Sequence, residues 1–400
     1  MHSETAGDSI RQDMRYLAGT LPHRGANTEN ERTAAEYIHK RFKENTNQSA
    51  IEDFHSIDTY HFLFASYMGE FFIVSLVAFW FPLAALIYGS IVFVTYIAEF
   101  TGYRVASRLL PEYASQNVTA RFPGARGKRQ IVVLAHYDSP KDTPLAKPQA
   151  AQWLRPVHFG LVACMMVVIL SCLMGVLELF QDGPMRVDLV SRWAATGILV
   201  TAAGALALWE AMADFQPGAN NNASGTAVLL ELANRLRETP PEDADVWLVA
   251  TGSKEGWLNG VRDFIVRHDL DQADAYMVNI EQVGAGELAC IEGEGLLHTF
   301  HSDKALTALM LEEGEAFNAQ SRTHRGVPTD LLIPLTRGYR AAGIMGAESP
   351  GTERHTDSLA HVDFQLAWQA ANWAEQVVRR LDTDAAEKAK AEAPGAVRAS

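Results

Sequence analysis

Cysteine is scarce in this sequence, with three residues, Cys164, Cys172 and Cys290, among 400. So few cysteines give no basis for a disulfide framework. The sequence also has no cluster of Lys and Arg, and its net charge is -14 at pH 7, which argues against a nucleic-acid partner. The first 50 residues are polar and lack the apolar stretch of a secretory signal. We therefore expect targeting to depend on an apolar segment further along the chain.

Charged side chains are absent from three long stretches. A bilayer core needs about 20 apolar residues in a helix, and backbone groups there must hydrogen-bond within their own segment, so we predict that these stretches are membrane helices. A buried core helix is the alternative for the shortest of them. The stretches without Asp, Glu, Lys or Arg are 71–98, 157–177 and 193–209.

The first of these stretches is too long for one helix. It contains Pro82 near its middle, and its apolar character extends back to about residue 60. Because proline interrupts a helix, we predict two helices within 60–100 that meet at a tight turn around Phe81. The other two stretches form a second pair, 157–209, around the polar loop 178–188. The sequence thus predicts two transmembrane helical hairpins with four crossings.

The remainder is long enough for one sizeable soluble domain of the α/β class. Short apolar runs bounded by turn residues are typical of buried parallel strands, and longer periodic segments alternate with them as helices. The expected strands are 130–135, 246–250, 275–280 and 342–345, and the expected helices are about 29–43, 226–236 and 363–381.

Polar side chains follow the expected strands, where ligands commonly bind in α/β sheets. His136 and Asp138 come directly after the first strand, and a His with a carboxylate two residues later is typical of a metal ligand and its orienting partner. Taken alone, His136 fits a structural role as well. The loop 217–225 contains three asparagines, of which a helix cap would explain only one.

The order of these motifs resembles the zinc exopeptidase superfamily of bacterial aminopeptidases, glutamate carboxypeptidases and glutaminyl cyclases, metallopeptidase family twenty-eight. The motifs are H-x-D, P-G-A-N-x-N-A-S-G, T-G-x-x-E, an acid after a strand, and H-T-x-D, and they cover essentially the whole soluble portion. The resemblance implies a mixed central sheet flanked by helices, with two zinc ions at the strand ends. It also implies ligand sets: His136 and Glu281 for one zinc, Glu255 and His355 for the other, position 221 as the bridge, and Asp138 to orient His136.

Two positions depart from the pattern of active members. Asn221 stands where the bridging aspartate is expected, and a neutral amide offers one good oxygen donor and no charge. Lys254 stands at the position of the general base, a glutamate, and an ammonium cannot accept a proton from metal-bound water. Burial can lower the pKa of a lysine, but the neighbouring acids Glu255 and Glu281 oppose that shift. Glu281 replaces the usual aspartate and still supplies a carboxylate.

These replacements lead to two hypotheses. Asn for Asp and Lys for Glu add three units of positive charge, which opposes the binding of dications in a poorly solvated site. The first hypothesis is therefore a membrane-embedded, catalytically degenerate pseudopeptidase without zinc, in a scaffold, assembly or peptide-binding role, with Lys254 in place of a metal charge. The alternative is a functional membrane-anchored zinc-dependent aminopeptidase with an altered base or a single metal. The retained His136, Asp138, Glu255 and His355 favour it.

The predicted hairpins interrupt the peptidase-like domain, so each must return to the side from which it started. Lys and Arg are frequent on the domain side of the helices, and the positive-inside rule then places the domain in the cytoplasm, at an inner or cytoplasmic membrane. The expected partners are the lipid bilayer and another membrane protein or a peptide. The expected parts are 1–59, the N-terminal part of the peptidase-like domain; 60–100, hairpin 1; 101–156, the strands leading to His136 and Asp138; 157–209, hairpin 2; 210–381, the rest of the domain; and 382–400, a disordered tail.

Overall fold

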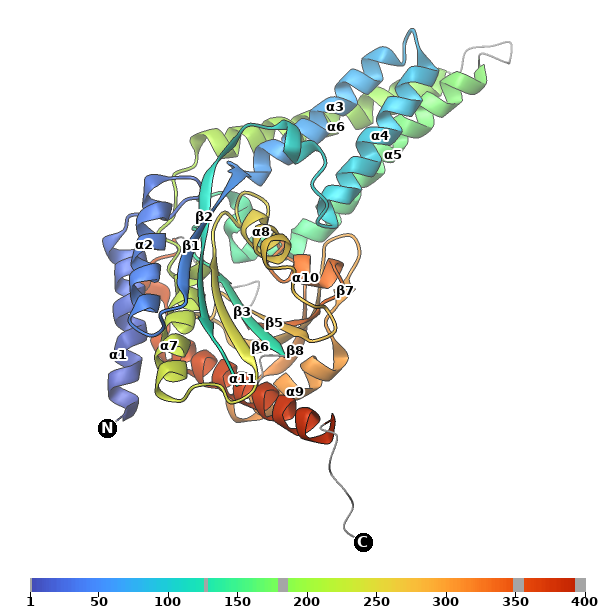
Figure 1. Cartoon of the computed structure of the whole chain (residues 1–400). Coiled ribbons are helices and arrows are strands. Elements are labelled where there is room, and N and C mark those ends of the chain that lie inside the picture. Colours follow the sequence, from blue (N-terminus) through green and yellow to red (C-terminus); the bar gives the residue numbers. More distant parts are fainter. Residues whose placement is uncertain (1, 126–128, 179–185, 348–355, 393–400) are drawn as a thin grey trace.

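The computed structural model describes residues 2–125, 129–178, 186–347 and 356–392. Within these residues, nine strands form one mixed sheet (Figure 1). The strands are β1 (Ser49–Ile57), β2 (Glu112–Phe122), β3 (Gln130–His136), β4 (Asp245–Thr251), β5 (Ala275–Glu281), β6 (Glu287–Glu294), β7 (Phe300–His301), β8 (Gln320–His324) and β9 (Arg340–Ala347). Their order is β1-β2-β4-β3-β5-β9-β6-β7, with β8 beside β6.

The centre of the sheet is parallel. β3 pairs in parallel with β4 and β5, and β5 pairs in parallel with β9. Successive residues of β3 face opposite sides, so Ile131 and Val133 enter one core while Val132 and Leu134 enter another. All four side chains are fully buried. A parallel strand covered on both faces explains why the run is apolar throughout rather than alternating.

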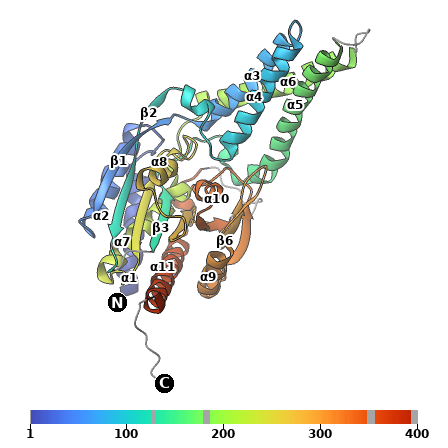
Figure 2. The ribbon, with the colours of Figure 1, turned by 45° about the vertical axis from the view of Figure 1, so that its right-hand side comes forward.

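Helices cover both faces of the sheet, which confirms the predicted α/β architecture (Figures 1 and 2). One core contains residues of α1 (His2–Arg15), α2 (Glu29–Lys43), α7 (Ser224–Glu238), α9 (Lys304–Gly314) and α11 (Phe364–Glu392). The core on the opposite face contains residues of α8 (Asn259–His268) and α10 (Leu332–Thr336).

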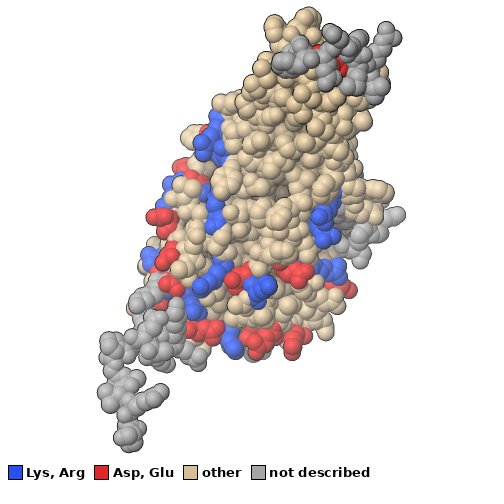
Figure 3. Space-filling model, turned by 90° about the vertical axis from the view of Figure 1, so that its right-hand side faces the viewer, with Lys and Arg blue, Asp and Glu red and all other residues tan. Residues whose placement is uncertain are grey.

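Four further helices project from one end of this body (Figures 1 and 2). They are α3 (Tyr60–Val77), α4 (Pro82–Phe100), α5 (Ala151–Glu178) and α6 (Arg186–Met212). By length and composition, these are the four helices of the described chain that are long and apolar enough to cross a membrane. On the face that Figure 3 shows, the surface over these helices is almost free of charged side chains, whereas Lys, Arg, Asp and Glu gather over the body. Pro82 is the first residue of α4, as the predicted turn requires.

Some elements differ from the sequence-based prediction. β1 and β2 were not predicted, because β2 buries the polar residues Gln116, Asn117 and Thr119 and therefore has no apolar run. We expected the last helix to end near Leu381 and a disordered tail to follow, but α11 continues to Glu392, since an Ala-, Glu- and Lys-rich sequence favours helix. Residues 393–400 and part of the loop 178–188 lie outside the described residues.

Candidate functional site

The carboxyl ends of three parallel strands bring most of the predicted site residues together. β3 ends at His136 and β5 ends at Glu281. Lys254 and Glu255 follow β4 by three and four residues. Because neighbouring parallel strands end at the same edge of a sheet, side chains separated by more than a hundred residues in sequence meet there.

His136 lies between two carboxylates. Its Nε2 is 3.0 Å from Glu281 Oε1, and its Nδ1 is 3.2 Å from Asp138 Oδ1. Burial by itself lowers the pKa of His136, but Glu281 and Asp138 raise it to about 10. Burial by itself raises the pKa of Glu281, but His136 and Lys254 lower it to about 2. The three side chains thus form a buried ion-paired group, with Asp138 in the position expected of an orienting carboxylate.

Lys254 adds a second cation to this group. Its side chain is buried, and its Nζ lies 3.0 Å from Glu255 Oε1. Burial lowers the pKa of Lys254, but the carboxylates of Glu255 and Glu281 outweigh that effect and hold the pKa above its ordinary value. Lys254 is therefore an ammonium at neutral pH and has no lone pair with which to accept a proton.

The Asn221 loop approaches the group from the start of α7. Asp357 holds this loop, because its two carboxylate oxygens accept hydrogen bonds from the backbone N–H groups of Asn220 and Asn221, at 2.8 and 2.7 Å. Among the described residues, neither Asn221 Oδ1 nor Glu281 Oε2 has a hydrogen-bond partner, although both are buried. Two buried acceptors of this kind suit a cation or an added donor. His355 lies outside the described residues, so its predicted place in the site stays a prediction.

Arg24 was not among the predicted site residues, yet it joins the two loops of the site. Its guanidinium is fully buried and donates to the carbonyl oxygens of Tyr137, Pro217 and Gly218 at 2.6 to 2.9 Å, and to that of Leu17. Burial lowers its pKa to about 10. A lone arginine in a turn carries no sequence signal for this role.

Glu31 was also missed. Thr28 and Glu31 match a capping-box pattern at the start of α2, and Thr28 does cap the helix. However, Glu31 Oε1 accepts a hydrogen bond from the backbone N–H of Ser253 at 2.9 Å, in the turn that carries Lys254. Burial and the charge of Asp138 raise the pKa of Glu31 to about 8. The sequence analysis predicted a helix from about residue 29 but not the link between Glu31 and the site.

Another buried acid lies behind the site. Glu294 accepts hydrogen bonds from the backbone N–H of Thr329, at 2.5 Å, and from its hydroxyl, at 2.7 Å. Burial raises the pKa of Glu294 to about 8. Glu294 follows an ordinary strand pattern, and nothing in the sequence indicated that its side chain points inward.

The apolar helices take part in the site. A cleft of about 370 Å³ contains Asn221, Lys254 and Glu255 in its wall, together with Tyr60 from the start of α3. The backbone N–H of Tyr60 donates to the carbonyl oxygen of Glu255 at 3.1 Å. Trp257 Nε1 donates to the carbonyl oxygen of Glu99, in the last turn of α4, also at 3.1 Å. The turn that carries Lys254 is thus attached to both helices of the first apolar pair.

Comparisons with known proteins agree with this architecture. Residues 205–378 match the sequence profile of peptidase family M28, whereas a search of curated proteins found no match. Among solved structures, a zinc aminopeptidase from Bacillus subtilis has a TM-score of 0.54 at 16% identity, over 94% of each chain. An aminopeptidase from an Aneurinibacillus strain has a TM-score of 0.55 at 13% identity, over 94% of this chain and 93% of that one. A glutaminyl cyclase from an Acidobacteriales bacterium has a TM-score of 0.53 at 15% identity, over 94% of this chain and 95% of that one. The structural matches show a similar fold, and the profile match confirms the resemblance predicted from the motifs.

Proposed function

We propose, from the match of residues 205–378 to peptidase family M28, that this chain is a membrane-embedded pseudopeptidase. In this proposal the aminopeptidase-like domain carries no hydrolytic zinc pair, and its cleft serves a scaffold, assembly or peptide-binding role. The observation that carries the proposal is the buried contact of 3.0 Å between Lys254 Nζ and Glu255 Oε1.

The donor set is a poor match for two zinc ions. Lys254 places a fixed positive charge beside Glu255, which the family resemblance assigns to one of the ions, and Asn221 supplies no charge at the bridging position. Two dications would lie within a few ångströms of that ammonium in a poorly solvated site, where repulsion between like charges is strong. We propose instead that Lys254 neutralises the carboxylates that a metal would otherwise neutralise.

Metal content tests the proposal. The protein purified in mild detergent is expected to contain less than one zinc per chain, and two zinc ions per chain would overturn the idea. Replacing both departures, Asn221→Asp with Lys254→Glu, makes the site more negative by three charges and should increase zinc binding. The control pair Asn318→Asp with Lys304→Glu makes the same change of charge at exposed positions and should leave zinc binding as in the wild type.

A working aminopeptidase with a single zinc is the second candidate function. The buried oxygens of Asn221 and Glu281 that have no hydrogen-bond partner among the described residues favour it, as does the contact between His136 and Asp138. In that case the protein would hydrolyse aminoacyl substrates, a chelator would abolish the reaction, and so would His355→Ala. Zinc-dependent turnover with these properties would replace the pseudopeptidase proposal, whereas its absence in zinc-supplemented protein would leave the first proposal standing.

We also propose that the four apolar helices cross a lipid bilayer as two hairpins, 60–100 and 157–209, which interrupt the peptidase-like domain. Large apolar side chains on their outer faces support this placement, among them Trp80, Ile91 and Leu170. The excess of Lys and Arg on the domain side supports a cytoplasmic domain at an inner or cytoplasmic membrane. Reporter fusions at the carboxyl terminus should therefore give a cytoplasmic signal, and an extracytoplasmic signal would exclude this orientation.

A further inference from the structure

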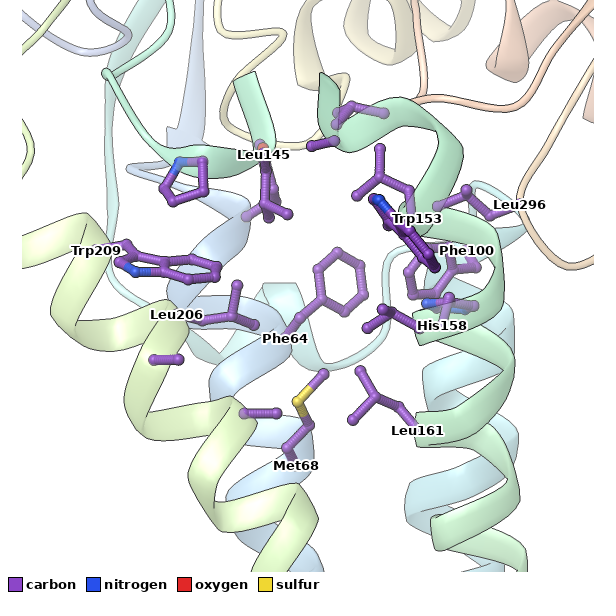
Figure 4. A pocket seen from close by; sticks show the side chains of 18 of the residues that line it. Phe64, Met68, Phe100, Leu145, Trp153, His158, Leu161, Leu206, Trp209 and Leu296 are labelled. Atoms are coloured by element: carbon purple, nitrogen blue, oxygen red, sulfur yellow. The ribbon is translucent and has the colours of Figure 1, made fainter. Parts of the chain in front are cut away.

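An apolar pocket lies where the four long helices join the body. α3 packs on α6 and α4 packs on α5, and the pocket, of about 360 Å³, lies between these pairs. Leu206 and Trp209 of α6 face Leu161 and Trp153 of α5 across it, with Phe64 of α3 between them (Figure 4). Its volume is in the range of pockets that hold small ligands.

The pocket reaches the outer surface of the helices. Trp153 and Val157 belong to its wall, and their exposed fractions are 63% and 56%. Tryptophans are typical of the headgroup level of a bilayer, and both Trp153 and Trp209 lie in this wall. A lipid chain can therefore enter the pocket from the side at that level.

The pocket offers little to a peptide backbone. The hydroxyl of Tyr96 already contacts the His158 ring, at 3.3 Å, and Trp257 Nε1 is bonded to the backbone of α4. A peptide segment placed there would leave its N–H and C=O groups without partners in an apolar environment, which is costly. An acyl chain has no such groups, so it is the better occupant.

The pocket adjoins the cleft of the candidate site. Both cavities share wall residues. The wall of the cleft contains five cationic side chains and one acid, Glu255. Three of the cations are ion-paired, Lys141 with Glu210, Lys254 with Glu255 and Arg322 with Glu287, which leaves Arg325 and Lys147 as the cations available to a ligand. Arg325 is exposed and has no acidic partner within 4 Å among the described residues, and Lys147 is 3.6 Å from Asp142. The shared residues are Tyr60, Leu145, Leu154 and Val327, and the cations are Lys141, Lys147, Lys254, Arg322 and Arg325.

We propose that the apolar pocket and the adjoining cleft together bind one anionic phospholipid of the bilayer. One acyl chain occupies the apolar pocket, and the phosphate lies at the mouth of the cleft beside Arg325 and Lys147, which supply charge-assisted hydrogen bonds. The inference rests on the proposed membrane placement. Carbonate extraction tests that placement separately, since a chain released into the soluble fraction would refute the placement itself.

Native mass spectrometry of the full chain in mild detergent, with added phosphatidylglycerol or phosphatidylcholine, tests the proposal. The wild type should retain one phosphatidylglycerol per chain, in preference to phosphatidylcholine. Ala205→Trp fills the pocket from α6 and should reduce retention at least tenfold. The matched control is Gly204→Trp on the same helix, where an added Cβ meets open space, and it should retain lipid as the wild type does. Ala202→Leu, in the same pocket wall, replaces Ala205→Trp if that variant does not fold.

The headgroup is tested by Arg325→Gln, which should reduce the preference for phosphatidylglycerol over phosphatidylcholine. Arg108→Gln, at an exposed site near the end of α4 but outside both cavities, is the control and should keep the preference. Equal retention in the Ala205 and Gly204 variants would overturn the pocket assignment. Equal retention of the two lipids by the wild type would overturn the anionic headgroup. Displacement of the lipid by an apolar peptide, with the same sensitivity to the Ala205 variant, would overturn the choice of lipid as occupant.

Discussion

Removal of the Lys254 ammonium gives the most direct test of the charge arrangement in the site. Lys254→Met keeps a side chain of similar length. It leaves Glu255 without its ion-pair partner and removes a nearby positive charge from Glu281. The side chains of Lys254 and Glu255 are only 4% and 13% exposed, and loss of one partner of a buried pair costs about 3–5 kcal/mol. Because Glu255 is partly hydrated, we expect the lower end of that range.

A loss of about 3 kcal/mol corresponds to a fall of roughly 6–12 °C in the unfolding midpoint of a domain of this size. Tryptophan fluorescence during thermal unfolding in detergent measures it. Lys304→Met, at an exposed position of α9, is the matched control and should change the midpoint by about 1 °C or less. Added zinc should raise the midpoint of the Lys254 variant more than that of the wild type, since the competing cation is gone. An unchanged midpoint in the Lys254 variant, or an equal zinc effect on both proteins, would refute this account of the lysine.

Three further perturbations test the surroundings of the site. Burial raises the pKa of Glu294 from 4.5 to about 8, so the folded state binds the extra proton and the stability that this contributes is lost as pH rises through 8. The unfolding free energy of the wild type should therefore fall relative to that of Glu294→Gln between pH 5 and 8, by up to about 1.4 kcal/mol per pH unit; parallel pH profiles would contradict this. Arg24→Met leaves several buried carbonyl oxygens without a donor and should cost at least about 3 kcal/mol in urea unfolding, and a loss below about 1 kcal/mol would show that water replaces the guanidinium. Trp257→Phe keeps an aromatic ring but removes the bond to Glu99, so hydrogen exchange in the turn that carries Lys254 should become faster, and unchanged exchange would show that the bond does not hold the turn.

The sequence predicted the parts of the fold that hydropathy marks. The parallel strands are buried on both faces, so their apolar runs were visible, and Pro82 marked the division of the first long stretch. β2 was not predicted because polar residues interrupt its buried apolar ones. These polar side chains hydrogen-bond to other elements, as Asn117 does with the backbone of Gly260. The length of α11 depended on helix propensity rather than on an apolar stripe, and a prediction based on the stripe ended it too early.

The site was predictable only where chemistry follows a motif. His136 and Glu281 were found because each follows a predicted strand, and Lys254 because it stands before Glu255 in the T-G-x-x-E motif. The structure brings the three together, while the metal-binding roles of His136 and Glu281 stay predictions. Arg24 and Glu31 act through backbone groups of distant loops, and contacts between a side chain and a distant backbone leave no residue pattern along the chain. The apolar pocket likewise depends on the angle between helix pairs, which no periodicity specifies.

The way the helix pairs interrupt the sheet bears on how the nascent chain matures. β3 finds its neighbours only in β4 and β5, and the ribosome completes α5 and α6 before either of those strands emerges. If the helices enter the bilayer as they are made, β3 stays unpaired, with its apolar side chains exposed to water, until α5 and α6 have been inserted. Slow insertion of α5 and α6 would then increase aggregation of the unfinished sheet domain.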